Sequence, residues 1–457
     1  MSHSSLALGT TLGLVSVVLV AALTASGEPV PAGQREGRGI SPKVAPTATP
    51  APSDGRPAAT DLATAGLDGW PAALGRQFAE LLAVADDALR GLLAGEDQAD
   101  DQPAETRTRE RGSSRPADKR RLRLVRTISG GMAPKSIVSD QRGRVYAMNM
   151  MYGHSITVFD RHYKRVKDIS DTIDLSRYGY RGYPEPVQGA PAEAAVSPDG
   201  RKIYVSNYSM YGPGFKHPGF DLCKASDRID RSFVYEIGTT SLRKTAAIEV
   251  GEVPKYLAIS PNGRTLLVGN WCSWDISVVD LRQRREVARI PAGVAPRGIA
   301  FSPNGRTAYV TLVGEDRVLV IDMRSRRVER DIRGVGERPR HLVMSPEGRF
   351  LYITSEGKDK PHREDGGIIK YDTRRQRVVA RSKPLVEPRT TVISDDGRAL
   401  YVVDYYPGTI VKLATDDLSE LQDRYLGFHP IGVTYDVASD KVWVAGYGGQ
   451  VWVLKDR

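Results

Sequence analysis

The chain has little of the side-chain chemistry on which many enzymes depend. Among its 457 residues there are two cysteines and seven histidines, and the histidines are scattered along the sequence. The zinc motif H-E-x-x-H, the nucleophile motif G-x-S-x-G, a glycine-rich phosphate loop and the haem-attachment motif C-x-x-C-H are all absent. These absences exclude the enzyme classes that the motifs define, and we expect neither a bound metal nor a cofactor.

Long apolar runs are equally scarce, because Leu6–Leu23 is the one uncharged stretch of membrane-spanning length. With 26% charged and 40% hydrophobic residues, the chain as a whole has a soluble globular composition. No cysteine lies near the end of the run, which excludes a lipoprotein anchor, and no lysine or arginine precedes it. Small residues follow it, so we interpret residues 1–26 as either a cleaved export signal or a membrane anchor.

The segments that follow lack most of what a folded core requires. Residues 27–65 are rich in proline, alanine and glycine, which predicts an extended linker. Residues 66–95 differ, because apolar side chains between Leu74 and Leu92 recur on one helical face. The polar face of this amphipathic helix is acidic, which favours docking or self-pairing over a membrane surface. Residues 96–121 are charged and predict a second linker.

The excess of positive charge lies in the rest of the chain. The whole sequence has 65 Lys and Arg against 55 Asp and Glu, a net charge of +10. Residues 1–121 hold 13 basic and 15 acidic residues, so residues 122–457 carry a net charge of +12. A domain this basic attracts anionic polymers, nucleic acid or lipid head groups, without selecting one of them.

Seven copies of one pattern fill this basic region. Each joins two short apolar runs through a turn such as Ser-Pro-Asn-Gly-Arg, as in PRGIAFSPNGRTAYVTL from Pro296. Proline presets φ in the turn and glycine takes the positive φ that follows, so the pattern predicts a tight β-hairpin. The repeats begin at Pro134, Pro191, Pro254, Pro296, Pro339, Pro388 and Pro430.

The spacing of these prolines predicts the fold. The steps are 57, 63, 42, 43, 49 and 42 residues, which is typical of propeller blades of four short strands. The last repeat ends one strand short, whereas Leu122–Ile128 precedes the first repeat and would supply the missing strand. Residues 122–457 are therefore predicted to form an all-β, seven-bladed β-propeller closed by an N-terminal strand.

The repeats also resemble a known family. The units Tyr204-Val205-Ser206-Asn207 and Tyr309-Val310-Thr311-Leu312 each follow a Ser-Pro-Asp/Asn-Gly-Arg turn and are similar to the YVTN-repeat family of seven-bladed propellers. The resemblance covers roughly residues 122–457 and implies the fold. Relatives range from surface or periplasmic binding proteins to lactonase-like enzymes and the propeller parts of redox enzymes, so the resemblance does not select an activity.

One face of the predicted propeller carries the long insertions. Residues 171–190, 208–232 and 356–367 fall in connections that either enter an inner strand or join the second strand to the third. These connections open on the same side, called here the loop face; the short Ser-Pro-Asn-Gly turns lie on the opposite turn face. Insertions on one face of a repeat ring usually mark the binding face, although neutral drift of loop length is the alternative.

Basic residues follow five of the seven repeat prolines, while Ala192 and Ile431 hold the other two positions. The five are Lys135, Lys255, Arg297, Arg340 and Arg389. Like charges in register around a narrow axis would focus a positive potential on the loop face and bind an anion. The alternative is that each pairs with a local acid such as Glu252, Glu337 or Glu387.

Aromatic side chains are expected beside these cations. The candidates for ligand contact are Trp271, Trp274, Tyr208 and Tyr405. Such rings suit stacking on sugars or bases, unless they only pack the inserted loops.

The two cysteines, Cys223 and Cys272, belong to adjacent blades of the same face. An even pair in an exported chain favours a disulfide. Closing about 49 residues would stabilise the fold by roughly 4 kcal/mol in the chain-entropy account.

An enzymatic alternative rests on three residues. His341 follows Arg340, and Glu193 and Tyr256 hold the matching positions in other blades. A histidine, a carboxylate and a phenol beside basic residues could open a lactone or a similar ester by acid–base chemistry.

Together these features predict an exported or membrane-tethered, monomeric propeller that serves as a binding or scaffolding module. The expected partner is an anionic polymer, a glycan or a protein at the cell envelope, recognised through the loop face. The alternatives are a lactonase-like hydrolase with its site at the channel mouth and, third, nucleic-acid binding.

Overall fold

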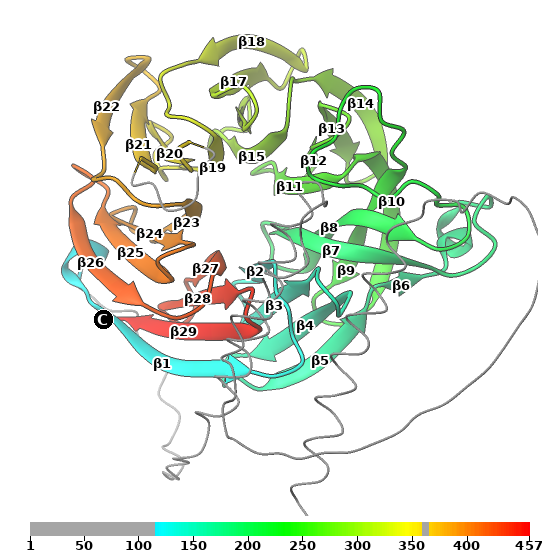
Figure 1. Ribbon diagram of the computed structural model, residues 1–457, viewed down its shortest axis with the longest axis horizontal. Helices are drawn as coiled ribbons and strands as arrows, with labels where there is room; N and C mark the ends of the chain where they lie inside the picture. Colours follow the sequence, from blue (N-terminus) through cyan, green and yellow to red (C-terminus); the bar gives the residue numbers. More distant parts are fainter. Residues whose placement is uncertain (1–114, 359–364) are drawn as a thin grey trace, which may run out of the picture. The chain divides into compact units, whose positions relative to one another are not determined.

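The computed structural model describes residues 115–358 and 365–457, and these form a seven-bladed β-propeller (Figure 1). The innermost strands of successive blades contact one another around the whole circle, since β2 meets both β7 and β27. The predicted all-β fold and blade number are therefore confirmed. The predicted signal or anchor, the first linker, the amphipathic helix and residues 96–114 of the second linker lie outside the described residues.

Four strands make up each of the first three blades, with one addition. Blade one contains β2 (Ser136–Ser139), β3 (Arg144–Asn149), β4 (Ser155–Asp160) and β5 (Arg165–Ser170). Blade two contains β7 (Val187–Val196), β8 (Lys202–Tyr211), β9 (Arg231–Gly238) and β10 (Lys244–Glu252), with β6 (Thr172–Ile173) added beside β7 and the 3-10 helix η2 (Leu175–Tyr178) between them. Blade three contains β11 (Pro254–Ile259), β12 (Thr265–Asn270), β13 (Asp275–Asp280) and β14 (Arg285–Pro291).

The remaining blades repeat this plan. Blade four contains β15 (Pro296–Phe301), β16 (Thr307–Leu312), β17 (Arg317–Asp322) and β18 (Arg327–Ile332). Blade five contains β19 (Pro339–Met344), β20 (Phe350–Ser355), β21 (Gly367–Asp372) and β22 (Arg377–Arg381). Blade six contains β23 (Pro388–Ile393), β24 (Ala399–Asp404), β25 (Thr409–Ala414) and β26 (Glu420–Tyr425).

The seventh blade joins the two ends of the propeller. It contains β27 (Pro430–Asp436), β28 (Lys441–Gly446) and β29 (Gln450–Asp456), completed by β1 (Leu122–Ser129). Figure 1 shows β1 in cyan along the red β29, and the two strands are antiparallel from Leu122↔Asp456 to Ser129↔Gln450. This pairing confirms the predicted closure. Residues just before β1 also join the fold, because Ala117 in the 3-10 helix η1 (Ala117–Lys119) and Arg120 are buried.

The turn chemistry of the repeats explains why the hairpins form where they do. In the turn of blade three, Gly263 N–H donates to Ser260 O over 2.8 Å, and Gly263 has a φ of +70°. The Ser260 hydroxyl oxygen accepts from Thr265 N–H at 3.0 Å, which ties the turn to the strand that follows. Positive φ at this position favours glycine, as the repeat pattern requires.

The middle strands of each blade are buried on both sides, since every sheet packs between two others. In β16, Ala308 and Val310 pack with Leu267 of blade three, whereas Tyr309 packs with Leu342 of blade five. Alternate side chains of a strand point to opposite faces, so one strand serves two interfaces. Within the described residues, no helix is long and apolar enough to cross a membrane, and the predicted anchor Leu6–Leu23 lies outside them.

Candidate functional site

A repeated irregularity in the inner strands of most blades places one side chain near the propeller axis. In blades three to seven, the pairing of the first two strands shifts directly after the repeat proline, as between Pro296 and Ile299. Such a bulge re-aims the residues beside it. The five predicted cations occupy these positions or, for Lys135, the residue just before β2. Lys135, Lys255, Arg297 and Arg340 are only 8%, 6%, 4% and 8% exposed.

Ion pairs show that these cations converge from different blades. Glu193 of blade two contacts Lys135 of blade one at 2.9 Å and Arg297 of blade four at 3.1 Å. Since blades one and four are not neighbours, a single carboxylate can meet both cations only near the axis. We call the five basic residues the cation ring.

A second carboxylate, Glu356, forms ion pairs with other members of the cation ring. It accepts from Arg340, lies 2.9 Å from the Arg389 guanidinium and lies 3.1 Å from that of Arg338. Burial opposes the ionisation of Glu356, but these arginines outweigh it and lower its pKa to about 2. Arg389 also contacts Glu387, one of the local acids that the sequence suggested.

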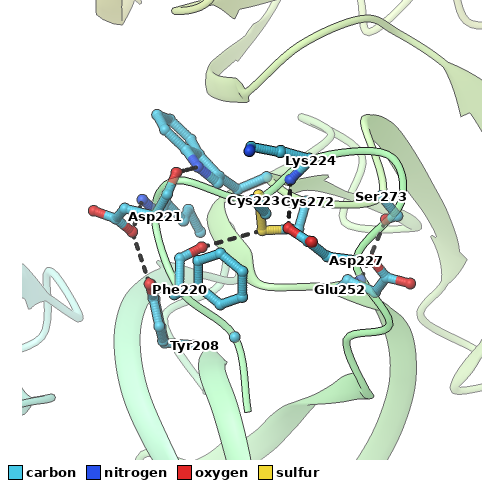
Figure 2. Close-up of a disulfide and its surroundings, with 12 residues drawn as sticks. Tyr208, Phe220, Asp221, Cys223, Lys224, Asp227, Glu252, Cys272 and Ser273 are labelled. Carbon is cyan, nitrogen blue, oxygen red and sulfur yellow. Dashed lines mark hydrogen bonds and ion pairs between the residues drawn. A yellow bond between two sulfur atoms is a disulfide. The ribbon is translucent and has the colours of Figure 1, made fainter. Parts of the chain in front are cut away.

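The fifth cation, Lys255, is covered by the insertion of blade two. Its ammonium donates to Asp221 Oδ1 at 2.7 Å and lies 3.6 Å from the centre of the Trp271 ring. Tyr208 Oη donates to the same carboxylate oxygen at 2.7 Å (Figure 2). Trp271 and Tyr208 therefore lie beside a ring cation, as the sequence suggested, and Asp221, like Glu356, is an acid that sequence reasoning missed.

The other predicted aromatic residues have different surroundings. The Arg389 guanidinium lies 4.5 Å from the centre of the Tyr405 ring, which stacks on His429 at 4.1 Å. Trp274 is half-buried in the turn after β12, where its carbonyl accepts from Ala292 N–H and Gly293 N–H. Tyr405 thus lies against a member of the cation ring, whereas the contacts of Trp274 hold the connection to the next blade.

Positive charge exceeds negative charge in this cluster. The cation ring and Arg338 supply six cations, and Asp221, Glu193, Glu356 and Glu387 supply four carboxylates. Burial lowers the pKa of Lys135 to about 7 and that of Lys255 to about 8, with neighbouring arginines lowering both further against the attraction of Glu193 and Asp221. The two lysines thus give up charge under conditions in which an isolated lysine would keep it.

Several buried donors of the cluster have no acceptor in residues 115–358 and 365–457. Within the described residues, no hydrogen-bond partner is present for Arg297 Nη1, Arg340 Nε or Arg389 Nε. A buried charged N–H without an acceptor is costly, and most buried polar groups in folded proteins are paired. These donors are therefore suited to a ligand that brings oxygen acceptors and negative charge.

The three residues of the enzymatic alternative do come together. The His341 and Tyr256 rings are 4.8 Å apart at 82°, and His341 interacts electrostatically with Glu193. Burial, with Arg297, Arg340 and Lys135, lowers the pKa of His341 to about 3, and burial raises that of Tyr256. Glu193 has a lowered pKa because Lys135 and Arg297 outweigh its burial. The imidazole is thus neutral, and neither of its ring nitrogens has a hydrogen-bond partner among the described residues.

The two cysteines form a disulfide at the edge of this cluster. Cys223 and Cys272 are bonded, with Cα atoms 5.7 Å apart, and join the blade-two insertion to the turn after β12 (Figure 2). Ile229 and Val253 pack beside Cys272. The bridge holds the insertion close to Trp271, whose Nε1–H donates to Asp221 O at 2.8 Å.

Fold and site together define a class of protein: a disulfide-containing seven-bladed β-propeller with an acid-bridged cation ring near its axis. Comparison with known proteins adds two similarities. A model of the family described as cytochrome D1 heme domain matches residues 307–425. A solved structure of hydrazine synthase from Kuenenia stuttgartiensis matches with a TM-score of 0.57 and 21% identity, over 72% of this chain and 97% of that chain.

The two similarities carry different weight. The likeness to hydrazine synthase shows the fold alone, and no curated protein matches the chain. The family match spans part of blades four to six, and it includes Arg340, His341, Glu356 and Arg389 of the cluster. The predicted YVTN-repeat resemblance remains a resemblance, because the comparisons support the propeller fold without that family.

Proposed function

We propose that the protein is an extracytoplasmic binding module that holds the carboxylate or phosphate groups of an anionic ligand at the cation ring. The observation that supports this proposal most strongly is the set of buried arginine donors without acceptors, in a cluster of the described residues where cations outnumber carboxylates. Burial strengthens charge-assisted hydrogen bonds, because the local dielectric is low. The disulfide suits an oxidising compartment outside the cytoplasm.

The burial of the cation ring limits the kind of ligand. Four of its cations are at most 8% exposed, so an extended polymer backbone would not reach all of them. A small anion, or an anionic group that projects from an envelope polymer, glycan or protein partner, fits better. The same reasoning makes nucleic acid, whose phosphates follow an exposed backbone, a weaker candidate.

The lactonase alternative receives less support from the same geometry. A general base is most effective with a pKa near the working pH, and the pKa of His341 is about 3. Glu193 is held by two cations, which stabilise its charged form and make it a poor proton acceptor. The cluster is therefore better arranged for binding an anion than for transferring protons.

Binding can be tested by calorimetric titration of oxalate and inorganic phosphate into the protein. Replacing Arg340 and Arg389 by glutamine should weaken binding about tenfold or more, since a hydrogen bond to a charged group contributes roughly 1.5–3 kcal/mol. The matched control, Arg264→Gln with Arg306→Gln, removes two exposed charges from the turn face and should change binding little. Equal losses in both variants would show that only diffuse net charge acts, and the proposal would fail.

A second candidate ligand is a haem-type group, which the match to the cytochrome D1 heme domain favours. The donor chemistry suits such a group, because His341 is neutral, is surrounded by cations and has two ring nitrogens without a partner among the described residues. His341 is only 4% exposed, so its imidazole would have to be uncovered before an iron could reach it. His341 would supply a nitrogen ligand, and Arg340 and Arg389 would hold carboxylate side chains. Bound haem would supply redox or small-molecule-binding chemistry through its iron.

This candidate is tested by adding haemin and recording the visible absorption spectrum. A shifted Soret band in the parent protein that His341→Ala abolishes would support haem binding. His162→Ala, on the turn after β4, removes an exposed imidazole on the turn face and should leave the shift intact. An unchanged spectrum in the parent protein would exclude the haem candidate and leave the anion proposal standing.

A further inference from the structure

The connection between β8 and β9, residues 212–230, differs from its counterparts in the other blades. The equivalent connection in blade three is residues 271–274 and in blade four residues 313–316. We call residues 212–230 the inserted loop. The inserted loop also covers Lys255, one of the cations of the ring.

Asp221 of the inserted loop lies on the solvent side of Lys255. The Asp221 side chain is 65% exposed, whereas that of Lys255 is 8% exposed. Partial desolvation by the surrounding protein opposes ionisation of Asp221, but Lys255 outweighs it and, together with Tyr208 and the more distant Arg340, lowers the pKa of the carboxyl group well below its usual range. The carboxylate thus remains charged and forms the outer boundary of the cation ring at this point.

The surroundings of Asp221 are those that a ligand carboxylate would use. One oxygen accepts from both the Lys255 ammonium and the Tyr208 hydroxyl, each at 2.7 Å. The Lys255 ammonium also lies over the Trp271 ring, 3.6 Å from its centre. A carboxylate from outside would find the same two donors and the same aromatic surface.

Two features tie the inserted loop to this place. The Cys223–Cys272 disulfide lies two residues beyond Asp221, and Gly219 lies two residues before it. A Cβ on Gly219 would lie 2.1 Å from Val253 Cγ2, so the loop passes directly against the Val253 side chain, two residues before Lys255. Gly219 N–H also donates to Ser209 Oγ at 2.8 Å. The carboxylate is therefore held between two fixed points.

We propose that the inserted loop is a disulfide-anchored lid whose Asp221 carboxylate occupies an anion position of the cation ring. An external ligand competes with Asp221 for Lys255 and Tyr208 and displaces it. The disulfide keeps the displaced carboxylate near its position, which raises its effective concentration as a competitor. The inference rests on the proposed anion binding and describes how that binding is restrained.

The test compares Asp221→Asn with the parent protein in calorimetric titrations of oxalate at pH 6, where Lys255 of the parent protein, with a pKa of about 8, keeps its proton. This substitution keeps the size of the side chain but removes the competing charge, so the affinity for oxalate should rise about tenfold. Asp227→Asn is the matched control, because it removes the same charge from the same loop. Asp227 accepts from the backbone N–H of Lys224 rather than from a ring cation, so its replacement should leave the affinity unchanged.

A double-mutant cycle tests the role of the disulfide. Cys223→Ser with Cys272→Ser should raise oxalate affinity by less than Asp221→Asn does, because Asp221 remains but is less confined. Adding Asp221→Asn to the serine variant should then have less effect than it has in the parent protein, since the two changes act on one competitor. Melting temperatures of all variants show that each is folded.

The outcomes separate the two proposals. If the parent protein binds oxalate and Asp221→Asn does not bind it more tightly, the lid is overturned and the anion site stands. Tighter binding in Asp221→Asn and Asp227→Asn alike would also overturn the lid, because loop charge alone would explain it. If neither the parent protein nor Asp221→Asn binds oxalate or phosphate, both proposals fail.

Discussion

Lys135 and Lys255 are the members of the cation ring whose charge can change near neutral pH. Their pKa values are about 7 and about 8, because burial and neighbouring arginines disfavour the ammonium form. An anion bound beside them would favour protonation. The charge available to a ligand is therefore complete below these pKa values and is lost as the pH rises through them.

We accordingly expect the affinity for oxalate, which stays fully ionised, to fall between pH 6 and pH 9. The decline should reach at most roughly tenfold per pH unit for each lysine that must be protonated. Lys135→Met should remove the part of this decline near pH 7, whereas Lys164→Met, an exposed lysine on the turn face, should leave the profile unchanged. A pH-independent affinity in the parent protein would contradict the role of both lysines.

At the scale of elements, the joint between the chain ends has its own buried polar cluster. Asp456 of β29 contacts Lys412 of β25, and both side chains are fully buried. The Asp456 carboxylate also accepts from Tyr401 Oη at 2.6 Å, and Lys412 donates to Arg120 O at 3.1 Å. These contacts tie β25, β29 and the residues before β1 together where the propeller closes.

Removing one member of this buried pair should weaken the closure. Lys412→Met removes the ammonium nearest to Asp456 and leaves it Arg120, whose Nε lies 3.8 Å away. We therefore expect a loss of about 3 kcal/mol in the free energy of unfolding, near the lower end for a broken buried pair. The measurement is urea denaturation followed by tryptophan fluorescence. The double variant Lys412→Met with Asp456→Asn should recover part of the loss, because no uncompensated charge stays buried. A single variant as stable as the parent protein would show that the pair does not hold the joint.

At the scale of the whole propeller, closure brings distant parts of the chain to one place. The cation ring draws on residues from Lys135 to Arg389, and insertions in two blades supply acids that cover it. The exposed arginines of the turns, such as Arg264 and Arg306, lie on the other face. The loop face therefore combines buried, partly neutralised charge with long connections, whereas the turn face carries short hairpins.

The sequence by itself determined the fold, its closure and the positions of the ring cations. Hairpin turns depend on local chemistry, such as the positive φ of Gly263, so their repetition is readable along the chain. The residue after each repeat proline holds the same place in every blade, so the repeat pattern predicted that Arg297 and its equivalents would lie at matching positions. The disulfide could also be predicted from the sequence, because Cys223 and Cys272 fall at corresponding places in adjacent blades.

Only the tertiary structure decided which acids neutralise these cations. Of the local acids suggested by sequence, Glu387 does contact Arg389, whereas Glu337 lies 3.9 Å from Lys358. Glu193 instead bridges cations of non-neighbouring blades, and Asp221 reaches Lys255 from an inserted loop. The physical reason is that pairing across the axis depends on how seven blades converge and where the loops fold. The local sequence pattern of a single repeat determines neither how the blades converge nor where the loops fold.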